Sequence, residues 1–141
     1  MNIRQFSLKH GISLDTLRFY EKRKILIPDR LANGYRNYHD IHEKKIKLII
    51  SLKTIGFSLD EIKQLIELEE KPPSETCNII SNQLIDKKIA MISQQVMVLE
   101  YGKNTLHDIK KYIEGNSFVK NQERISNMIE NLYNLAKSTY E

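Results

Sequence analysis

The sequence predicts a mainly α-helical protein in which a winged helix-turn-helix head precedes a long helix and a shorter C-terminal helix. Three observations support this fold class. Apolar residues recur at helical spacing over most of the 141 residues. The dipeptide Asn33-Gly34 interrupts that spacing with the signature of a β-hairpin. A seven-residue apolar repeat begins near residue 85, and such a repeat is typical of a coiled coil.

The charge is divided unevenly along the chain. Residues 1–60 carry 12 Lys and Arg against 6 Asp and Glu, whereas residues 61–141 carry 10 against 12. A basic half joined to a nearly neutral half favours a module that binds a polyanion, with a merely solvated basic surface as the alternative. No stretch reaches the roughly 18 apolar residues of a membrane span. The start also lacks a signal-peptide core, so we expect a soluble, cytoplasmic protein without a membrane partner.

The first two predicted helices form a helix-turn-helix pattern. One short helix covers residues 3–9, Gly11 supplies a turn residue that tolerates positive φ, and Ser13 can cap the next helix. That second helix covers about residues 14–24, places Leu17 inward and is polar and basic as a whole. The pattern is typical of proteins that place their second helix in a DNA groove, although many helical hairpins pack only against their own core.

A small hairpin, or wing, is predicted directly after these helices. Asn33-Gly34 favours a two-residue turn because both positions accept positive φ. The residues that follow include Tyr35, Arg36 and Tyr38. Arginine can bind a phosphate as a fork, and a tyrosine hydroxyl can donate to another phosphate oxygen. The alternative is that the tyrosines pack the hairpin onto the helices.

Two further helices complete the predicted head. Asp40 is expected to cap a helix that ends at Gly56, and Ser58 is expected to cap another that ends before Pro72-Pro73. The prolines separate the two halves of the chain. We therefore predict a DNA-binding head over residues 1–71, a dimerisation helix over 75–114, and a C-terminal amphipathic helix over 117–141 that is a possible effector-responsive region.

The long helix carries an apolar seam. Apolar residues recur every seven positions from Ile85 to Ile113 and have companions at intermediate positions. So long a helix cannot hide its seam inside a small chain, so we expect a second copy to cover it. The predicted dimerisation residues are Ile85, Ile89, Ile92, Val96, Leu99 and Leu106.

Several linked motifs in the head resemble the MerR family of bacterial transcriptional regulators. They are Thr16-Leu17-Arg18-Phe19-Tyr20-Glu21, Asn33-Gly34-Tyr35-Arg36-Asn37-Tyr38 and the segment from Leu52 to Ile62. The resemblance implies a winged helix-turn-helix, an antiparallel coiled-coil homodimer, and promoter DNA and RNA polymerase as partners. It also implies that a signal leads the regulator to bend and untwist the promoter spacer, a deformation that costs several kcal/mol.

The resemblance assigns roles to individual residues. Arg18 and Phe19 are expected to read base edges, the wing is expected to grip the backbone, and Lys53 and Phe57 match a second, smaller wing region. The predicted DNA-binding residues are Thr16, Arg18, Phe19, Tyr20, Tyr35, Arg36, Tyr38, Lys53 and Phe57. Reasoning from the residues alone supports Arg18 and Arg36. It leaves Phe19 open between a base contact and core packing. The resemblance gives Tyr20 a nearby structural or phosphate role.

The second half does not identify the signal. Metal-sensing relatives hold an ion with cysteines in the loop after the long helix and with a residue at that helix's start. Cys77 matches the second position, but the loop Glu114–Ser117 contains no cysteine. Soft ions need two or three thiolates, so no metal site and no cofactor is predicted. Cys77 is then either a small buried residue or a redox-responsive thiol at a helix start, where the dipole favours thiolate.

Other chemistry is weakly represented. His39 and His42 could share a metal, but two ligands are insufficient and a cap or surface role is expected. No nucleophile–base set or phosphate loop occurs, so we expect no enzyme. The rival hypotheses are a coiled-coil interaction protein that does not bind DNA and a thiol-redox catalyst using Cys77. Residues that could line a hydrophobic effector pocket, or simply form core, are Tyr101, Tyr112, Tyr133, Phe118, Met91, Met97 and Met128.

Overall fold

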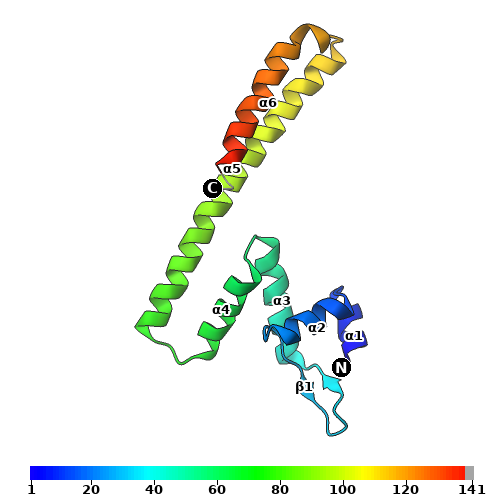
Figure 1. Cartoon of the computed structure of the whole chain (residues 1–141), viewed down its shortest axis with the longest axis vertical. Coiled ribbons are helices and arrows are strands. Elements are labelled where there is room, and N and C mark those ends of the chain that lie inside the picture. Colours follow the sequence, from blue (N-terminus) through cyan, green and yellow to red (C-terminus); the bar gives the residue numbers. More distant parts are fainter. Residues whose placement is uncertain (139–141) are drawn as a thin grey trace. The chain divides into compact units, whose positions relative to one another are not determined.

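Six α-helices, a short 3₁₀ helix and a two-stranded sheet make up residues 1–138, the part of the chain that this computed structural model describes (Figure 1). The elements are α1 (Ile3–His10), α2 (Leu14–Lys22), β1 (Asp29–Arg30), β2 (Arg36–Asn37), α3 (Asp40–Thr54), α4 (Leu59–Glu70), α5 (Glu75–Glu114), η1 (Val119–Asn121) and α6 (Gln122–Lys137). The predicted fold class is confirmed. The last part of the predicted C-terminal helix, residues 139–141, lies outside the described residues. Contacts divide the chain within α5 into two units, Met1–Ile85 and the part that begins at Asp86.

Side-chain caps fix the starts of α2 and α4. The hydroxyl Oγ of Ser13 accepts a hydrogen bond from the backbone N–H of Thr16 at 3.0 Å. Ser58 accepts from the N–H of Glu61 at 3.1 Å, and the Glu61 carboxylate accepts in return from the N–H of Ser58. A cap of this kind stabilises a helix by about 1 kcal/mol. Both predicted helix starts are therefore confirmed.

Helix α3 is capped by His39 and not by Asp40, the residue that the sequence predicts as the cap. Asp40 is the first helical residue, and His39 occupies the capping position. The backbone N–H of His39 donates to Nδ1 of His42 at 2.9 Å, and Nε2 of His42 lies 3.0 Å from the carbonyl oxygen of Ile27. An accepting Nδ1 leaves the ring proton on Nε2, which donates to that carbonyl. The buried His42 thus has the capping role expected for it.

The wing is a three-residue hairpin rather than the predicted two-residue one. Arg30 pairs with Arg36 in the antiparallel ladder. The N–H of Leu31 donates to the Tyr35 carbonyl at 2.9 Å, and the N–H of Gly34 donates to the Leu31 carbonyl at 2.8 Å. Gly34 has a φ of 79°, whereas the asparagine before it does not have a positive φ. A turn followed by a left-handed glycine is a common three-residue hairpin, and it needs only one residue with positive φ.

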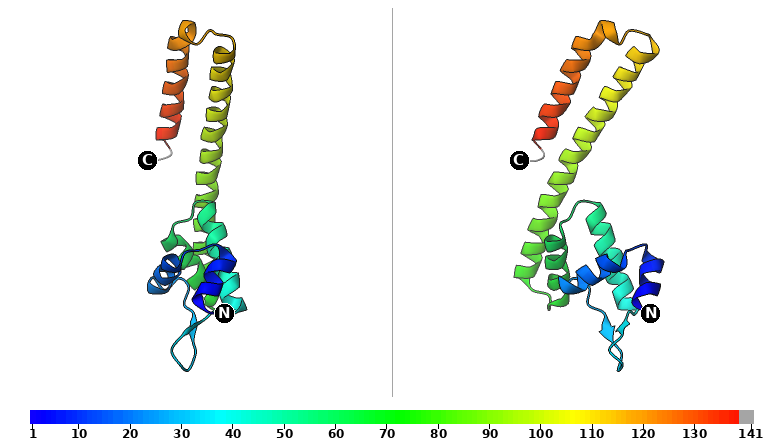
Figure 2. Two further views of the ribbon diagram at one scale, coloured as in Figure 1. Left: turned by 90° about the vertical axis from the view of Figure 1, so that its right-hand side faces the viewer. Right: turned by 45° about the vertical axis from the view of Figure 1, so that its right-hand side comes forward.

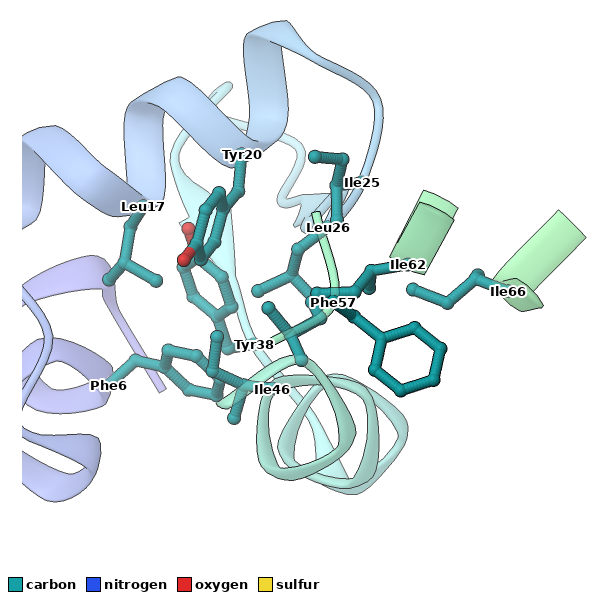
Figure 3. Packing of buried hydrophobic residues seen from close by; sticks show 11 residues of the cluster. Phe6, Leu17, Tyr20, Ile25, Leu26, Tyr38, Ile46, Phe57, Ile62 and Ile66 are labelled. Carbon is teal, nitrogen blue, oxygen red and sulfur yellow. The ribbon is translucent and has the colours of Figure 1, made fainter. Parts of the chain in front are cut away.

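One apolar cluster joins the elements of the Met1–Ile85 unit (Figure 3). Its buried members are Phe6, Leu17, Tyr20, Ile25, Leu26, Tyr38, Ile46, Ile49, Phe57, Ile62 and Ile66. The rings of Phe6 and Tyr38 stack with centroids 4.3 Å apart, so the segment that follows the wing is held against α1. Leu84 packs at the edge of the cluster, and the first turns of α5 therefore belong to this unit.

In the second unit, α6 runs antiparallel beside the C-terminal half of α5 (Figures 1 and 2). Near the connection, Nη1 of Arg124 donates to the hydroxyl of Tyr112 at 3.1 Å. At the other end, Nε2 of Gln94 donates to Oγ of Ser138 at 3.2 Å. The C-terminal helix therefore packs back along the long helix of its own chain.

Helix α5 leaves most of its predicted seam uncovered in one chain. Five of the six predicted dimerisation residues are between 42% and 72% exposed: Ile85, Ile89, Val96, Leu99 and Leu106. Ile92 is half-buried. Across the described part of the chain, no helix is long and apolar enough to cross a membrane.

Candidate nucleic-acid interface

Helix α2 buries one face and leaves the other open. Leu17 and Tyr20 point into the core, while Arg18 and Phe19 remain on the surface. Phe19 is 45% exposed, which favours a contact role over core packing for this ring. Nη1 of Arg18 lies 3.0 Å from Oδ1 of Asp15, and both side chains are exposed. Such a surface pair contributes about 0.2–1 kcal/mol, so a stronger acceptor can displace Asp15.

A groove of about 440 Å³ brings together two residues that are far apart in the sequence. Thr16, at the start of α2, and Lys53, near the end of α3, both line it, together with Ser13 and Thr54. The first turn of a helix carries backbone N–H groups and a positive dipole end, and both attract anions. Three hydroxyl-bearing residues and a lysine beside such a turn are suited to a backbone phosphate.

Glu21, in the last turn of α2, binds two arginines of the wing. Nη2 of Arg30 lies 2.6 Å from Oε1 of Glu21, and Nε of Arg36 lies 2.6 Å from Oε2. The Glu21 side chain is 18% exposed. Nη1 of Arg30 also donates to the carbonyl of Gly34 at 3.0 Å. One carboxylate therefore joins the second helix of the helix-turn-helix to the wing.

Neither Arg30 nor the role of Glu21 is predicted from the sequence. A two-residue turn at Asn33-Gly34 would place Arg30 opposite Asn37, but the observed register places it opposite Arg36. Like charges directly opposite on a hairpin are destabilising, so the observed register calls for a nearby anion. A correct prediction of the hairpin register would have placed Arg30 opposite Arg36 and so indicated the contact of both arginines with Glu21.

The tip of the wing is open to solvent. Tyr35 is highly exposed and lines a hollow of about 350 Å³ together with Arg30, Arg36 and Asn2. Of the predicted wing residues, the structure brings Tyr35 and Arg36 together on this surface.

Three predicted DNA-binding residues lie instead in the core: Tyr20, Tyr38 and Phe57. Tyr38 and Phe57 pack inside this cluster (Figure 3), whereas Tyr20, although only 4% exposed, also lines the groove that contains Thr16 and Lys53. Tyr38 is only 1% exposed, and its hydroxyl has no hydrogen-bond partner among the described residues. Burial raises the pKa of this hydroxyl. The alternative that the tyrosines pack the hairpin onto the helices applies to Tyr38.

The second unit holds an apolar trough between α5 and α6. Its volume is about 680 Å³, and it lies where Gly102 presents no side chain toward Leu132. The lining residues are Val98, Leu99, Gly102, Lys103, Leu106, His107, Lys110, Leu132 and Ala136. The aromatic residues and methionines predicted for an effector pocket do not line this trough.

Cys77 is half-buried in the first turn of α5, where its backbone N–H donates to Oγ of Ser74 at 3.1 Å. Within residues 1–138, no group of three or more His, Cys, Asp or Glu side chains is placed to hold a metal ion.

An exposed arginine and phenylalanine on the second helix of a helix-turn-helix, beside an arginine-bearing wing, define a winged helix-turn-helix DNA-binding protein. Residues 1–69 match the family described as MerR HTH family regulatory protein, and residues 44–109 match the one described as MerR, DNA binding. The chain belongs to the MerR family of transcriptional regulators. This confirms the predicted family and, because these proteins are DNA-binding regulators, the prediction that the chain is not an enzyme.

Curated relatives and solved structures agree with this assignment. The chain is 33% identical to the HTH-type transcriptional regulator CueR of Yersinia pestis over 97 residues, which cover 68% of each protein. It is 30% identical to the regulator HmrR of Rhizobium leguminosarum bv. viciae, covering 76% of this chain and 87% of that protein. It is also similar to HiNmlR, a MerR family regulator lacking the sensor domain, bound to promoter DNA. There the TM-score is 0.56 at 28% identity, covering 78% of this chain and 92% of that one.

Proposed function

We propose that two copies of this chain bind one stretch of promoter duplex and control transcription by changing the shape of that duplex in response to a signal. Each head places Arg18 and Phe19 of α2 against base edges. The backbone on either side is held by the wing, through Tyr35 and Arg36, and by the groove that contains Thr16 and Lys53. RNA polymerase then engages the reshaped promoter.

One observation carries the DNA-binding part of this proposal. The exposed face of α2 has an anion-attracting feature on both flanks, with Lys53 at its start and the wing arginines at its end. A duplex presents phosphates on both sides of its major groove, so a helix in that groove needs cationic groups on both flanks. The similar protein HiNmlR is bound to promoter DNA in its structure, which supports promoter DNA as the ligand of this chain.

The exposed seam of α5 supports the homodimer. Residues such as Leu99 and Leu106 are more than half exposed in one chain, and a second copy of α5 running antiparallel would cover them. Two heads are needed to contact two half-sites about 34 Å apart, one helical turn of DNA. In this proposal residues 1–71 form the head, residues 75–114 the dimerisation helix, and residues from 117 onward the responsive region.

Charge reversal tests the DNA-binding surface. The double variant Arg18→Glu, Arg36→Glu should abolish salt-dependent binding to duplex DNA while leaving the dimer intact in sedimentation. Loss of the Arg36 phosphate contact alone should lower the slope of log affinity against log salt by about 1, and loss of Arg18 should cost about 1–3 kcal/mol of base discrimination. Lys120→Glu combined with Lys137→Glu makes the same change of net charge in the second unit and serves as the control. A wild-type protein with no salt-dependent duplex affinity would favour the coiled-coil interaction protein instead.

A further inference from the structure

We propose that Glu21 is a positioning residue for DNA binding: its carboxylate holds Arg30 and Arg36 in the geometry that receives a backbone phosphate. An acidic side chain on the DNA-facing side of the head would thereby raise affinity for a polyanion. The inference rests on the proposed function, because it concerns how the same surface binds a duplex.

The first step is the pairing of charges on the wing. Arg30 and Arg36 are direct partners in the two-residue ladder, so two guanidinium groups leave the hairpin at the same level. Without an anion between them they would repel and separate. Glu21 supplies that anion with one carboxylate oxygen for each arginine, both at 2.6 Å.

The second step concerns the N–H donors that each arginine keeps free for a ligand. Arg30 uses Nη2 for Glu21 and Nη1 for the Gly34 carbonyl, so it acts mainly as a strut that fixes the wing tip. Arg36 reaches Glu21 through Nε, and its two terminal nitrogens have no partner among the described residues. A guanidinium has five N–H donors, so four of those on Arg36 remain for a ligand. Two terminal N–H groups pointing the same way form the fork that binds a phosphate.

The third step is the place where the phosphate would lie. The hollow of about 350 Å³ at the wing is lined by both arginines, Tyr35 and Asn2. Arg36 is only 31% exposed, so its guanidinium is already held against the protein before DNA arrives. A side chain that is ordered in advance loses less conformational freedom on binding.

Two effects of Glu21 oppose each other, and their difference in sign makes the inference testable. As a negative charge, Glu21 repels DNA, so its neutralisation should tighten binding slightly. As a positioning group, it orders two arginines, so its neutralisation should weaken binding. The structure favours the second effect, because the carboxylate is only 18% exposed and is already neutralised by two short contacts.

The experiment compares Glu21→Gln, Glu21→Asp and the control Glu69→Gln. Glu69→Gln removes the same charge from an exposed position on α4. The probe is a fluorescent random-sequence duplex of about 30 base pairs, long enough for two half-sites. We expect Glu21→Gln to bind roughly tenfold more weakly than wild type, from the renewed freedom of two side chains. Glu21→Asp keeps the charge but shortens the reach, so it should also weaken binding, whereas Glu69→Gln should not.

A second background separates positioning from a general loss of structure. In Arg36→Met protein, Glu21→Gln should cost much less affinity than it does in wild type, because the phosphate fork is already gone. Equal costs in both backgrounds would overturn the inference, as would a Glu21→Gln protein that binds as tightly as Glu69→Gln or more tightly. Absence of duplex binding by the wild-type protein would instead refute the proposed function itself.

Discussion

Replacing Tyr38 with phenylalanine should leave the protein as stable as wild type or more stable. The Tyr38 hydroxyl is buried without a hydrogen-bond partner among the described residues, whereas in the unfolded chain it is hydrated. Leaving a buried hydroxyl unpaired costs about 1–3 kcal/mol. Phenylalanine keeps the ring that stacks on Phe6 and removes only this oxygen. We therefore expect Tyr38→Phe to raise the free energy of unfolding by about 1 kcal/mol.

The pH dependence of this gain has a definite sign. Burial, followed by the charge of Glu21, raises the pKa of Tyr38 above its ordinary value, and the arginines Arg36 and Arg30 oppose this. The folded state therefore holds the phenol proton more tightly than the unfolded state. The contribution of this raised pKa to the free energy of unfolding of the wild-type protein is fully present below about pH 10 and is lost as pH rises toward the folded-state pKa. The advantage of Tyr38→Phe over wild type should grow above about pH 10.

Urea unfolding, followed by fluorescence or circular dichroism, measures the gain in the free energy of unfolding at pH 7 and its increase at pH 10.5. A DNA titration measures the duplex affinity. The family resemblance assigns Tyr38 to DNA binding, whereas its burial predicts unchanged duplex affinity for Tyr38→Phe. The exposed Tyr35→Phe serves as the control, with a stability change within about 0.5 kcal/mol. A Tyr38→Phe protein that is clearly less stable, or that binds DNA more weakly, would refute the reasoning.

Three further predictions concern separate parts of the chain. Gly34→Ala should lower stability by about 1–2 kcal/mol in urea unfolding, because φ is 79° there; no loss would mean that the turn rearranges. Burial lowers the pKa of His10, with Glu43 opposing and Lys9 and Lys47 adding to the shift, so the folded state binds this proton less tightly than the unfolded state. Stability should fall as pH drops below about 6.5, and His10→Phe should flatten that slope between pH 7 and 5; an unchanged slope would contradict this. Ile92→Glu with Leu99→Glu should give monomers in sedimentation, since a seam buried in the proposed dimer does not tolerate unpaired charge; an unchanged dimer would count against the seam.

The helices could be predicted from the sequence because their determinants are local. Ser13 and Ser58 cap helices through bonds that span three residues, and the long apolar repeat needs no knowledge of the rest of the chain. The family could be predicted for a similar reason, because its motifs are contiguous. Arg18, Phe19 and Tyr35 are exposed as expected, since a polar helix face and a wing tip have few neighbours to cover them.

The features that could not be predicted depend on contacts between segments that are far apart in the sequence. The register of the hairpin is set by a three-residue turn that Asn33-Gly34 alone does not reveal, and an error of one residue concealed the opposition of Arg30 and Arg36. In strands of only two residues, alternation cannot decide which side faces the core, so the sequence leaves Tyr38 open between a phosphate contact and packing onto the helices. The proximity of Thr16 and Lys53 arises only when α2 and α3 pack together.

The three-way contact of Glu21, Arg30 and Arg36 constrains how this sequence can evolve. Loss of Glu21 alone would leave Arg30 and Arg36 facing each other without an anion between them. Loss of either arginine would leave the Glu21 charge incompletely neutralised next to the DNA phosphates. Substitutions at these positions should therefore arise together or through an intermediate in which one arginine has first become neutral. Among homologous sequences, a neutral residue at position 21 should accompany a neutral residue at position 30 or 36.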